Sequence, residues 1–347
     1  MRDDVSSRPP RVAATGEPED ERREADEIRC DLVTHGERFA DFGLEAHATW
    51  LREAGSVHPT LAHARMIIDT DVGGDPDDAV ALAVAVGTVP ELGPVVTSDE
   101  RGGARARFAR YLLDALGRPE VAVVSGRQLA DTRYFCVEGL MPAEVPAQST
   151  DVAGALRSLS DTSTGPLRWV GLGPASNLAD LATTHPDLVS RLVVAQIGGR
   201  DPLSQARPNF RLDPDAAATM LRSTAEPHLV ISDVTFRPEI EISADTPLYR
   251  SLADDTACGW KALVRANFDR WFGAFHSTSM LHDPLTLSAS LQLPYVDFSL
   301  ERVAVRPDGR MHRAGEGRPA FVSRSADYDA FMRWVQAGLE GTPAARR

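Results

Sequence analysis

The sequence predicts an α/β protein with a mostly parallel open sheet, helices on both faces, and a C-terminal hairpin followed by a helix. The main observation is that short apolar runs recur between longer helical stretches, which is the pattern of alternating strands and helices. A second is that several of these stretches open with Asp, Gly or Ser near the expected N-cap. A third is that 43% of the 347 residues are hydrophobic, which suffices for a sizeable core.

Six apolar runs are the expected strands of the parallel part. In chain order they are RMIID (65–69), GPVVTS (93–98), VAVVSG (121–126), LRWVGLG (167–173), RLVVAQIGG (191–199) and HLVISD (228–233). Parallel strands end at one edge of their sheet, where ligands of α/β proteins usually bind. Residues at the ends of these runs are therefore the first candidates for a site.

The expected helices lie between these runs, at 77–88, 102–117, 151–161, 175–184 and 213–223. The region 298–324 is typical of a hairpin with PDGR (307–310) as its turn, and SADYDAFMRWVQAGLE (325–340) of a last helix. We expect three parts: a disordered acidic and arginine-rich tail (1–27), a helical extension (28–63) and one α/β domain (64–342).

Composition excludes several classes of function. The net charge of -13 argues against binding nucleic acid or a membrane surface. Lys261 is the only lysine, and no GxxxxGK[ST] loop is present, which excludes lysine-dependent mechanisms. Three separated cysteines suggest neither a disulfide framework nor a metal site. With no apolar leader and no apolar run long enough to span a bilayer, we expect a cytoplasmic protein.

The stretch MIIDTDVGGDPDD (66–78) carries five aspartates in ten positions where a buried strand should end. Carboxylates this close repel one another, so water, protons or a cation must compensate. Capping of the next helix explains one or two of them. A hard cation such as Ca²⁺, which prefers oxygen ligands, explains the whole cluster. An EF-hand fails because Val80 stands where its bidentate Glu belongs, and a haloacid dehalogenase pattern fails at Gly73.

The stretch DTDVGGDPDDAVAL (69–82) resembles the DxDxxxDDxxAL fingerprint of the inosine-uridine preferring nucleoside hydrolase family, in a longer variant whose acidic pair comes two residues later. Further similarities follow in the family's order: VGLGPASNLADLA (170–182), QIGGR (196–200), NFRLDPDAA (209–217), SDVT (232–235) and LHDP (281–284). The resemblance covers roughly residues 64 to 340, and it implies a nucleoside hydrolase-like, Rossmann-related fold.

The resemblance implies a hydrolase that splits the N-glycosidic bond of a ribonucleoside, giving free base and ribose, with a water bound to Ca²⁺. The implied Ca²⁺ ligands are Asp71, Asp78, Asp283 and the carbonyl of Leu172, with Asp71 also as base. The implied ribose contacts are Asp77 and Asn209, and His282 would protonate the leaving base. Judged alone, His282 could be an ordinary satisfied histidine and Asn209 a turn residue.

The sequence departs from the family at two places. TSDERGG (97–103) stands where many members carry an asparagine, and Arg207 stands where a glutamate often faces the 5′ end of the sugar. An arginine there can pair with a carboxylate or phosphate, so a modified nucleoside or a nucleotide is a possible substrate; alternatively, Arg207 points to solvent or pairs with Asp201. These departures leave a second class open, a nucleoside- or nucleotide-binding regulatory protein with weak or no hydrolysis.

Three further expectations complete the prediction. The resemblance implies a homo-oligomer, either a dimer or a tetramer. Residues 127–145 correspond to a loop that closes over the site in the family. Candidates for stacking on a base are Trp169, Trp260 and Trp271, with core packing favoured for Trp169.

Overall fold

The protein is described by a computed structural model that covers residues 32–45, 48–49, 63–129, 134–200, 208–253 and 259–342. The chain divides into two units, Met1–Ala62 and His63–Arg347. In the first unit, residues 32–38 are helical and a 3-10 helix spans Ala40–Phe42. The predicted tail lies outside the described residues, and the three-part division of the chain stays a prediction.

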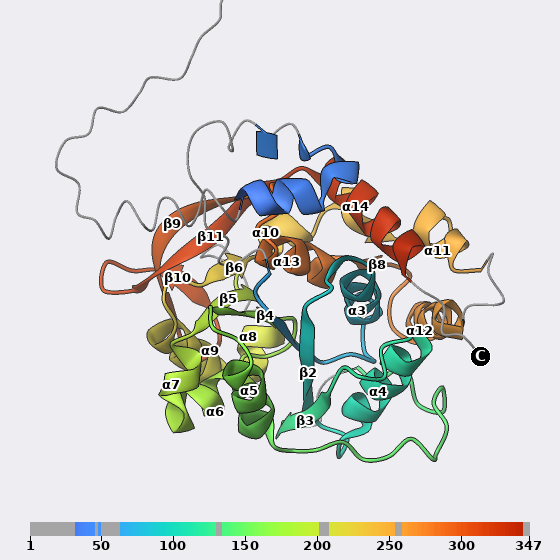
Figure 1. Ribbon diagram of the computed structural model, residues 1–347, viewed down its shortest axis with the longest axis horizontal. Coiled ribbons are helices and arrows are strands. Elements are labelled where there is room, and N and C mark those ends of the chain that lie inside the picture. The colour runs from blue at the N-terminus through green and yellow to red at the C-terminus, as the bar shows by residue number, and fades with distance from the viewer. Residues whose placement is uncertain are drawn as a thin grey trace, which may run out of the picture. The chain divides into compact units, whose positions relative to one another are not determined.

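The second unit is built on a nine-stranded sheet with the order β10-β9-β11-β6-β5-β4-β1-β2-β3 (Figure 1). The strands are β1 (Met66–Thr70), β2 (Leu92–Asp99), β3 (Val123–Gln128), β4 (Leu167–Gly171), β5 (Leu192–Ile197), β6 (His228–Val230), β9 (Val296–Val305), β10 (Met311–Arg313) and β11 (Arg318–Ala326). A separate two-stranded sheet joins β7 (Glu241–Ile242) and β8 (Ser279–Met280). The six predicted strands are therefore confirmed.

The sheet is mostly parallel, as predicted, and its antiparallel part is the C-terminal region. β9 pairs antiparallel with β10 and, on its other side, with β11. The predicted turn closes between Arg306 and Arg310, whose backbone N–H···O distance is 2.9 Å, and Gly309 has a φ of 80°. The hairpin is thus present, and β11 then extends it by joining β9 to the parallel strand β6.

The helices match the predicted ones closely, and three of them begin at a locally encoded cap. Asp151, Asp213 and Asp327 each accept a hydrogen bond from the backbone N–H three residues later. The helices are α3 (Asp77–Thr88), α4 (Ala104–Ala115), α5 (Val152–Asp161), α6 (Ser176–Thr184), α7 (Pro186–Val189), α8 (Pro208–Leu212), α9 (Pro214–Ser223), α10 (Ser232–Thr235), α11 (Pro247–Ser251), α12 (Gly259–Ala274), α13 (His282–Ser290) and α14 (Tyr328–Gly341).

Helices cover both faces of the sheet, as Figure 1 shows, with α3, α13 and α14 grouped on one face and α5, α6 and α9 on the other. α3 is buried from Asp77 to Val86 because it lies beneath α13 and α14. The approach to α14 is close: a Cβ on Gly87 would lie 2.2 Å from the carbonyl oxygen of Gly338. Glycine is required at this crossing.

The order of the central strands places a ligand site. From β1 the chain proceeds to β2 and β3 in one direction, and from β4 it proceeds to β5 and β6 in the other. The neighbouring strands β1 and β4 therefore form a topological switch point, and loops that leave their carboxyl ends diverge around a crevice. Within the described part of the chain, no helix combines the length and the apolar character needed to cross a membrane.

Candidate active site

The site begins at the carboxyl ends of β1 and β4, which are tied together through the backbone. The carbonyl of Asp69 accepts hydrogen bonds from the N–H groups of Leu172 and Gly173 at 2.6 and 3.2 Å. The buried carboxylate of Asp69 accepts from Nδ2 of Asn177 at 2.8 Å, and Oδ1 of Asn177 accepts from the N–H of Arg127 at 2.7 Å. Asp69 is therefore a supporting group, and it fixes the loops on which the other residues stand.

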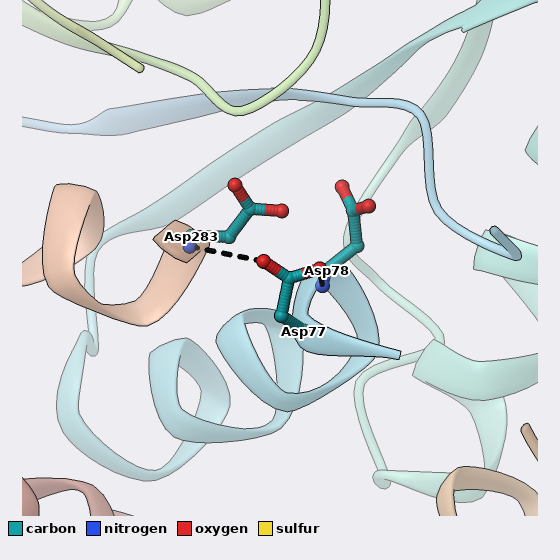
Figure 2. A group of neighbouring side chains, drawn as sticks. All are labelled: Asp77, Asp78 and Asp283. Carbon is teal, nitrogen blue, oxygen red and sulfur yellow. Dashed lines mark hydrogen bonds between the residues drawn. The ribbon is translucent and has the colours of Figure 1, made fainter. Parts of the chain in front are cut away.

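Three buried aspartates from two helix N-termini form the centre of the site. We call Asp77, Asp78 and Asp283 the carboxylate cluster: one oxygen of each lies within 4.8 Å of the others, and Figure 2 shows the three side chains converging. Their exposed fractions are 3%, 4% and 4%. Asp77 accepts from the N–H of Asp78 at 3.1 Å and from the N–H of Asp283 at 3.3 Å, so it bridges α3 and α13.

Burial and mutual repulsion make this cluster electrostatically costly. Burial, and after it the charge of Asp71, raises the pKa of Asp78 to about 7, although Thr70 donates a hydrogen bond to its carboxylate. Burial and the neighbouring carboxylates raise the pKa values of Asp77 and Asp283 as well. A divalent cation among these oxygens would offset both the cost of burying the carboxylates and their mutual repulsion. Carboxylates with a backbone carbonyl are a ligand set that suits Ca²⁺. The residues present therefore fit a metal ion.

Asp71 borders the cluster and acts on all three members through its charge. The carboxylate cluster contains Asp77 but not Asp71. The structure therefore brings the predicted sugar contact, Asp77, together with two of the predicted metal ligands, Asp78 and Asp283. The carboxylate of Asp71 lies against the loop after β4, because a Cβ on Gly173 would be 2.9 Å from its Oδ1. A glycine at 173 lets this carboxylate approach the loop.

The other predicted residues with a described position lie around the same crevice. Nδ2 of Asn209, in α8, donates to the carbonyl of Leu172 at 2.8 Å, which joins a predicted sugar contact to a predicted metal ligand. His282 precedes Asp283 at the start of α13, and its ring centroid lies 4.6 Å from that of Phe236, a residue 46% exposed. Arg207 lies outside the described residues.

Asp75 faces a different element from the carboxylate cluster. Its Oδ1 accepts a hydrogen bond from Oγ of Ser279 in β8. Burial raises the pKa of Asp75 to about 8, with further contributions from the charges of Asp78 and Asp71. The two-residue extension of the DTDVGGDPDD stretch thus places one more carboxyl beside the site, anchored on β8.

The sequence did not predict the roles of Asn177 and Arg105, and it left the role of the tryptophans undecided. Asn177 and Arg105 contact the DTD segment. Asn177 lies in the family-like stretch 170–182, but no role was predicted for it, and Arg105 is a single polar residue in a helical stretch without a local signal. The three candidate tryptophans are core residues, with Trp169 and Trp260 fully buried and Trp271 4% exposed. In the predicted closing loop, Tyr134 is 48% exposed and its ring contacts Trp271.

Comparison with known proteins gives consistent matches. Residues 66–333 match the family model described as inosine-uridine preferring nucleoside hydrolase. A pyrimidine-specific ribonucleoside hydrolase, RihA of Klebsiella pneumoniae, is 27% identical over 277 residues, which cover 71% of this chain and 85% of the relative.

Solved structures agree on the fold. A plant nucleoside hydrolase, PpNRh1, superposes with a TM-score of 0.67 at 19% identity, covering 80% of this chain and 98% of that one. A purine-preferring ribonucleoside hydrolase from Gardnerella vaginalis gives 0.66 at 21% identity, with the same coverage of 80% and 98%.

Proposed function

The chain belongs to the inosine-uridine preferring nucleoside hydrolase family, and from this premise we propose how its residues hydrolyse a ribonucleoside to free base and ribose. The observation that carries the proposal is the carboxylate cluster at the switch point of the sheet. Cleavage of a ribosyl C–N bond builds positive charge on the sugar, and buried carboxylates stabilise such charge.

We propose that the metal is Ca²⁺, which the carboxylates of Asp71, Asp78 and Asp283 and the carbonyl of Leu172 would hold. When bound, Ca²⁺ supplies charge compensation and orients the sugar and the attacking water. Asp71 would accept the proton of the attacking water, because a bound Ca²⁺ would be too weak a Lewis acid to ionise that water alone at neutral pH.

The remaining residues bind the substrate and handle the second proton. Asp77 and Asn209 hold the ribose hydroxyls; the two backbone N–H groups on Asp77 fix its carboxylate for this purpose. His282 delivers a proton to the departing base, which makes the base a better leaving group. Arg207 is proposed to recognise an anionic 5′ group.

The relatives' names divide between pyrimidine-specific and purine-preferring enzymes, so both kinds of base belong in a substrate panel. A cytoplasmic dimer or tetramer remains our proposal for the assembly. Size-exclusion chromatography with light scattering measures the oligomeric state directly, and a monomer would contradict it.

Product analysis of a panel of nucleosides and their 5′-monophosphates tests the function. With Ca²⁺ we expect free base and ribose to appear from a nucleoside, and free base and ribose 5-phosphate from a 5′-monophosphate. Both should disappear with a chelator and be lost in Asp71→Asn with the fold intact. Binding without release from any substrate would favour the regulatory protein instead. A clear preference for the unphosphorylated nucleosides would overturn the role of Arg207.

A further inference from the structure

The turn at 71–74, between β1 and the carboxylate cluster, has every carbonyl held from outside. Nη1 of Arg105 donates to the carbonyl of Asp71 and, at 3.1 Å, to that of Val72. The carbonyl of Gly73 accepts from the N–H of Cys136 at 2.6 Å, and that of Gly74 accepts from Nδ2 of Asn267 at 3.0 Å. Because a turn has no ladder of its own, these bonds determine where it lies.

Arg105, which lies in the first turn of α4, uses all five N–H groups of its guanidinium. Beside the two bonds from Nη1, Nη2 donates to Oε1 of Glu100 at 2.5 Å and to the carbonyl of Tyr134 at 2.7 Å, and Nε donates to Oε2 of Glu100 at 3.1 Å. Both side chains of the pair are 0% exposed. Only a planar fork meets these acceptors together, so lysine cannot replace it.

The same guanidinium joins the turn to the segment 134–137. Its Cζ lies 5.4 Å from the ring centroid of Phe135. The segment packs directly on the two glycines of the turn: a Cβ on Gly73 would lie 2.7 Å from Cγ2 of Val137, and one on Gly74 would lie 2.9 Å from the carbonyl of Tyr134. Arg105 therefore contacts the site loop and the loop expected to close over it.

Stability alone does not account for this ion pair. A buried pair gains little net stability over apolar side chains of similar volume, because desolvation offsets its attraction. What arginine adds is direction, since its rigid planar fork donates to three backbone carbonyls, those of Asp71, Val72 and Tyr134. Glu100 pairs with Arg105, and burial with the charge of Asp71 keeps the pKa of Asp78 raised although the charge of Arg105 lowers it, so Arg105 does not remove the need for a cation at the carboxylate cluster.

We infer that Arg105 is a positioning residue for hydrolysis, which holds the backbone of Asp71 and the segment 134–137 as one unit. The inference rests on the proposed function, in which Asp71 is a metal ligand and the base. A displacement of the turn by about 1 Å would misplace that carboxylate, at a cost of about 10²-fold in rate.

The test compares Arg105→Lys with Arg107→Lys. Arg107 lies on the same helix and donates to the carbonyls of Val145 and Ala143 at 2.7 and 2.8 Å. These acceptors are at the far end of the loop 127–145, outside both the turn and the segment 134–137. We measure Ca²⁺ affinity by calorimetry, kcat and KM with a nucleoside, and the thermal midpoint. For Arg105→Lys we expect Ca²⁺ affinity lower by about 10- to 100-fold and kcat by about 10²-fold. For Arg107→Lys, we expect both within about twofold of wild type.

If Arg105→Lys does not fold, Glu100→Leu/Arg105→Met replaces it, because that pair leaves no buried charge unpaired. The same losses are expected. Wild-type Ca²⁺ affinity and kcat in either folded Arg105 variant, or equal losses in Arg107→Lys, would overturn the inference. If the wild-type protein binds Ca²⁺ but releases no ribose, only the proposed hydrolysis is refuted. The Ca²⁺ affinities of the variants then still decide whether Arg105 positions the turn. A wild-type protein that binds no Ca²⁺ overturns both.

Discussion

Two clusters of charged side chains in this molecule differ in how their negative charge is compensated. In the carboxylate cluster, three buried acids converge and burial raises the pKa of each. On the C-terminal strands, Glu301 in β9 accepts from Arg313 at 2.5 Å and from Arg324, whose side chains are 45% and 44% exposed. Although burial raises the pKa of Glu301, its hydrogen bonds from Arg313 and Ser299 bring it below the usual value.

This difference distinguishes a candidate active site, the carboxylate cluster, from a surface network, the ion pairs around Glu301. Arginines of the same chain compensate the charge of Glu301, so no ligand is needed for this purpose. Water also screens the ion pairs of this network. The carboxylates of the carboxylate cluster repel one another, and an electrostatic cost of this kind is typically retained where function requires it. The comparison predicts that disturbing the first cluster changes activity, whereas disturbing the second changes stability slightly.

The largest effect is expected from Asp78→Asn. This change removes one proposed Ca²⁺ ligand and one charge that stabilises the sugar cation, so kcat/KM for a nucleoside should fall by about 10³-fold. Steady-state kinetics at one Ca²⁺ concentration, chosen to saturate the wild type, measure it. Glu301→Gln is the matched control and should stay within about twofold. Equal losses in the two variants would erase the distinction between the clusters.

Metal removal should lower stability through the carboxylate cluster. Calcium at about 100 times its dissociation constant stabilises a folded protein by about 2.7 kcal/mol, because the unfolded chain does not bind it. We expect the thermal midpoint to rise with added Ca²⁺ in wild type and to stay constant in Asp78→Asn. Calorimetric scans of chelator-treated protein measure both, and a Ca²⁺-dependent midpoint in the variant would count against the assignment.

The metal-free protein should lose stability as pH rises. The pKa values of Asp75 and Asp78 are raised to about 8 and about 7, whereas the unfolded chain has ordinary values near 3.9. The folded state therefore binds more protons between about pH 4 and 8, and the stabilising contribution present below pH 4 is lost across that window. Urea unfolding at pH 5 and pH 8 should differ by at least about 1 kcal/mol. A metal-free protein more stable at pH 8 would contradict this.

The smallest effect is expected at the surface network. Arg324→Ala removes one exposed partner of Glu301, and Arg313 still compensates the charge. We expect a loss of less than about 1 kcal/mol, reduced further by salt. Urea unfolding at low and high ionic strength measures it. A loss above about 2 kcal/mol would mean that this network supports the fold.

The fold was predictable because its signals are local. Asp151, Asp213 and Asp327 cap their own helices. The parallel pairing of β11 with β6 was not predictable, because it depends on which strands meet across the sheet.

The site was predictable only where one stretch carries it. The aspartates of residues 69–78 predict a cation site, and the family resemblance predicts its partners on the segments that form α8 and α13. The bonds from Arg105 to the carbonyls of Asp71 and Tyr134 leave no such trace. Carbonyls have no residue signature, and an arginine in a helix is indistinguishable from a solvent-exposed one until the fold brings the segments together.

Calcium titration calorimetry on chelator-treated protein tests the central claim most directly, because it needs no knowledge of the substrate. We predict roughly one Ca²⁺ per chain in wild type and in Glu301→Gln, and a loss of binding in Asp78→Asn and Asp283→Asn. Undiminished binding in both aspartate variants, or no binding in wild type, would contradict the account.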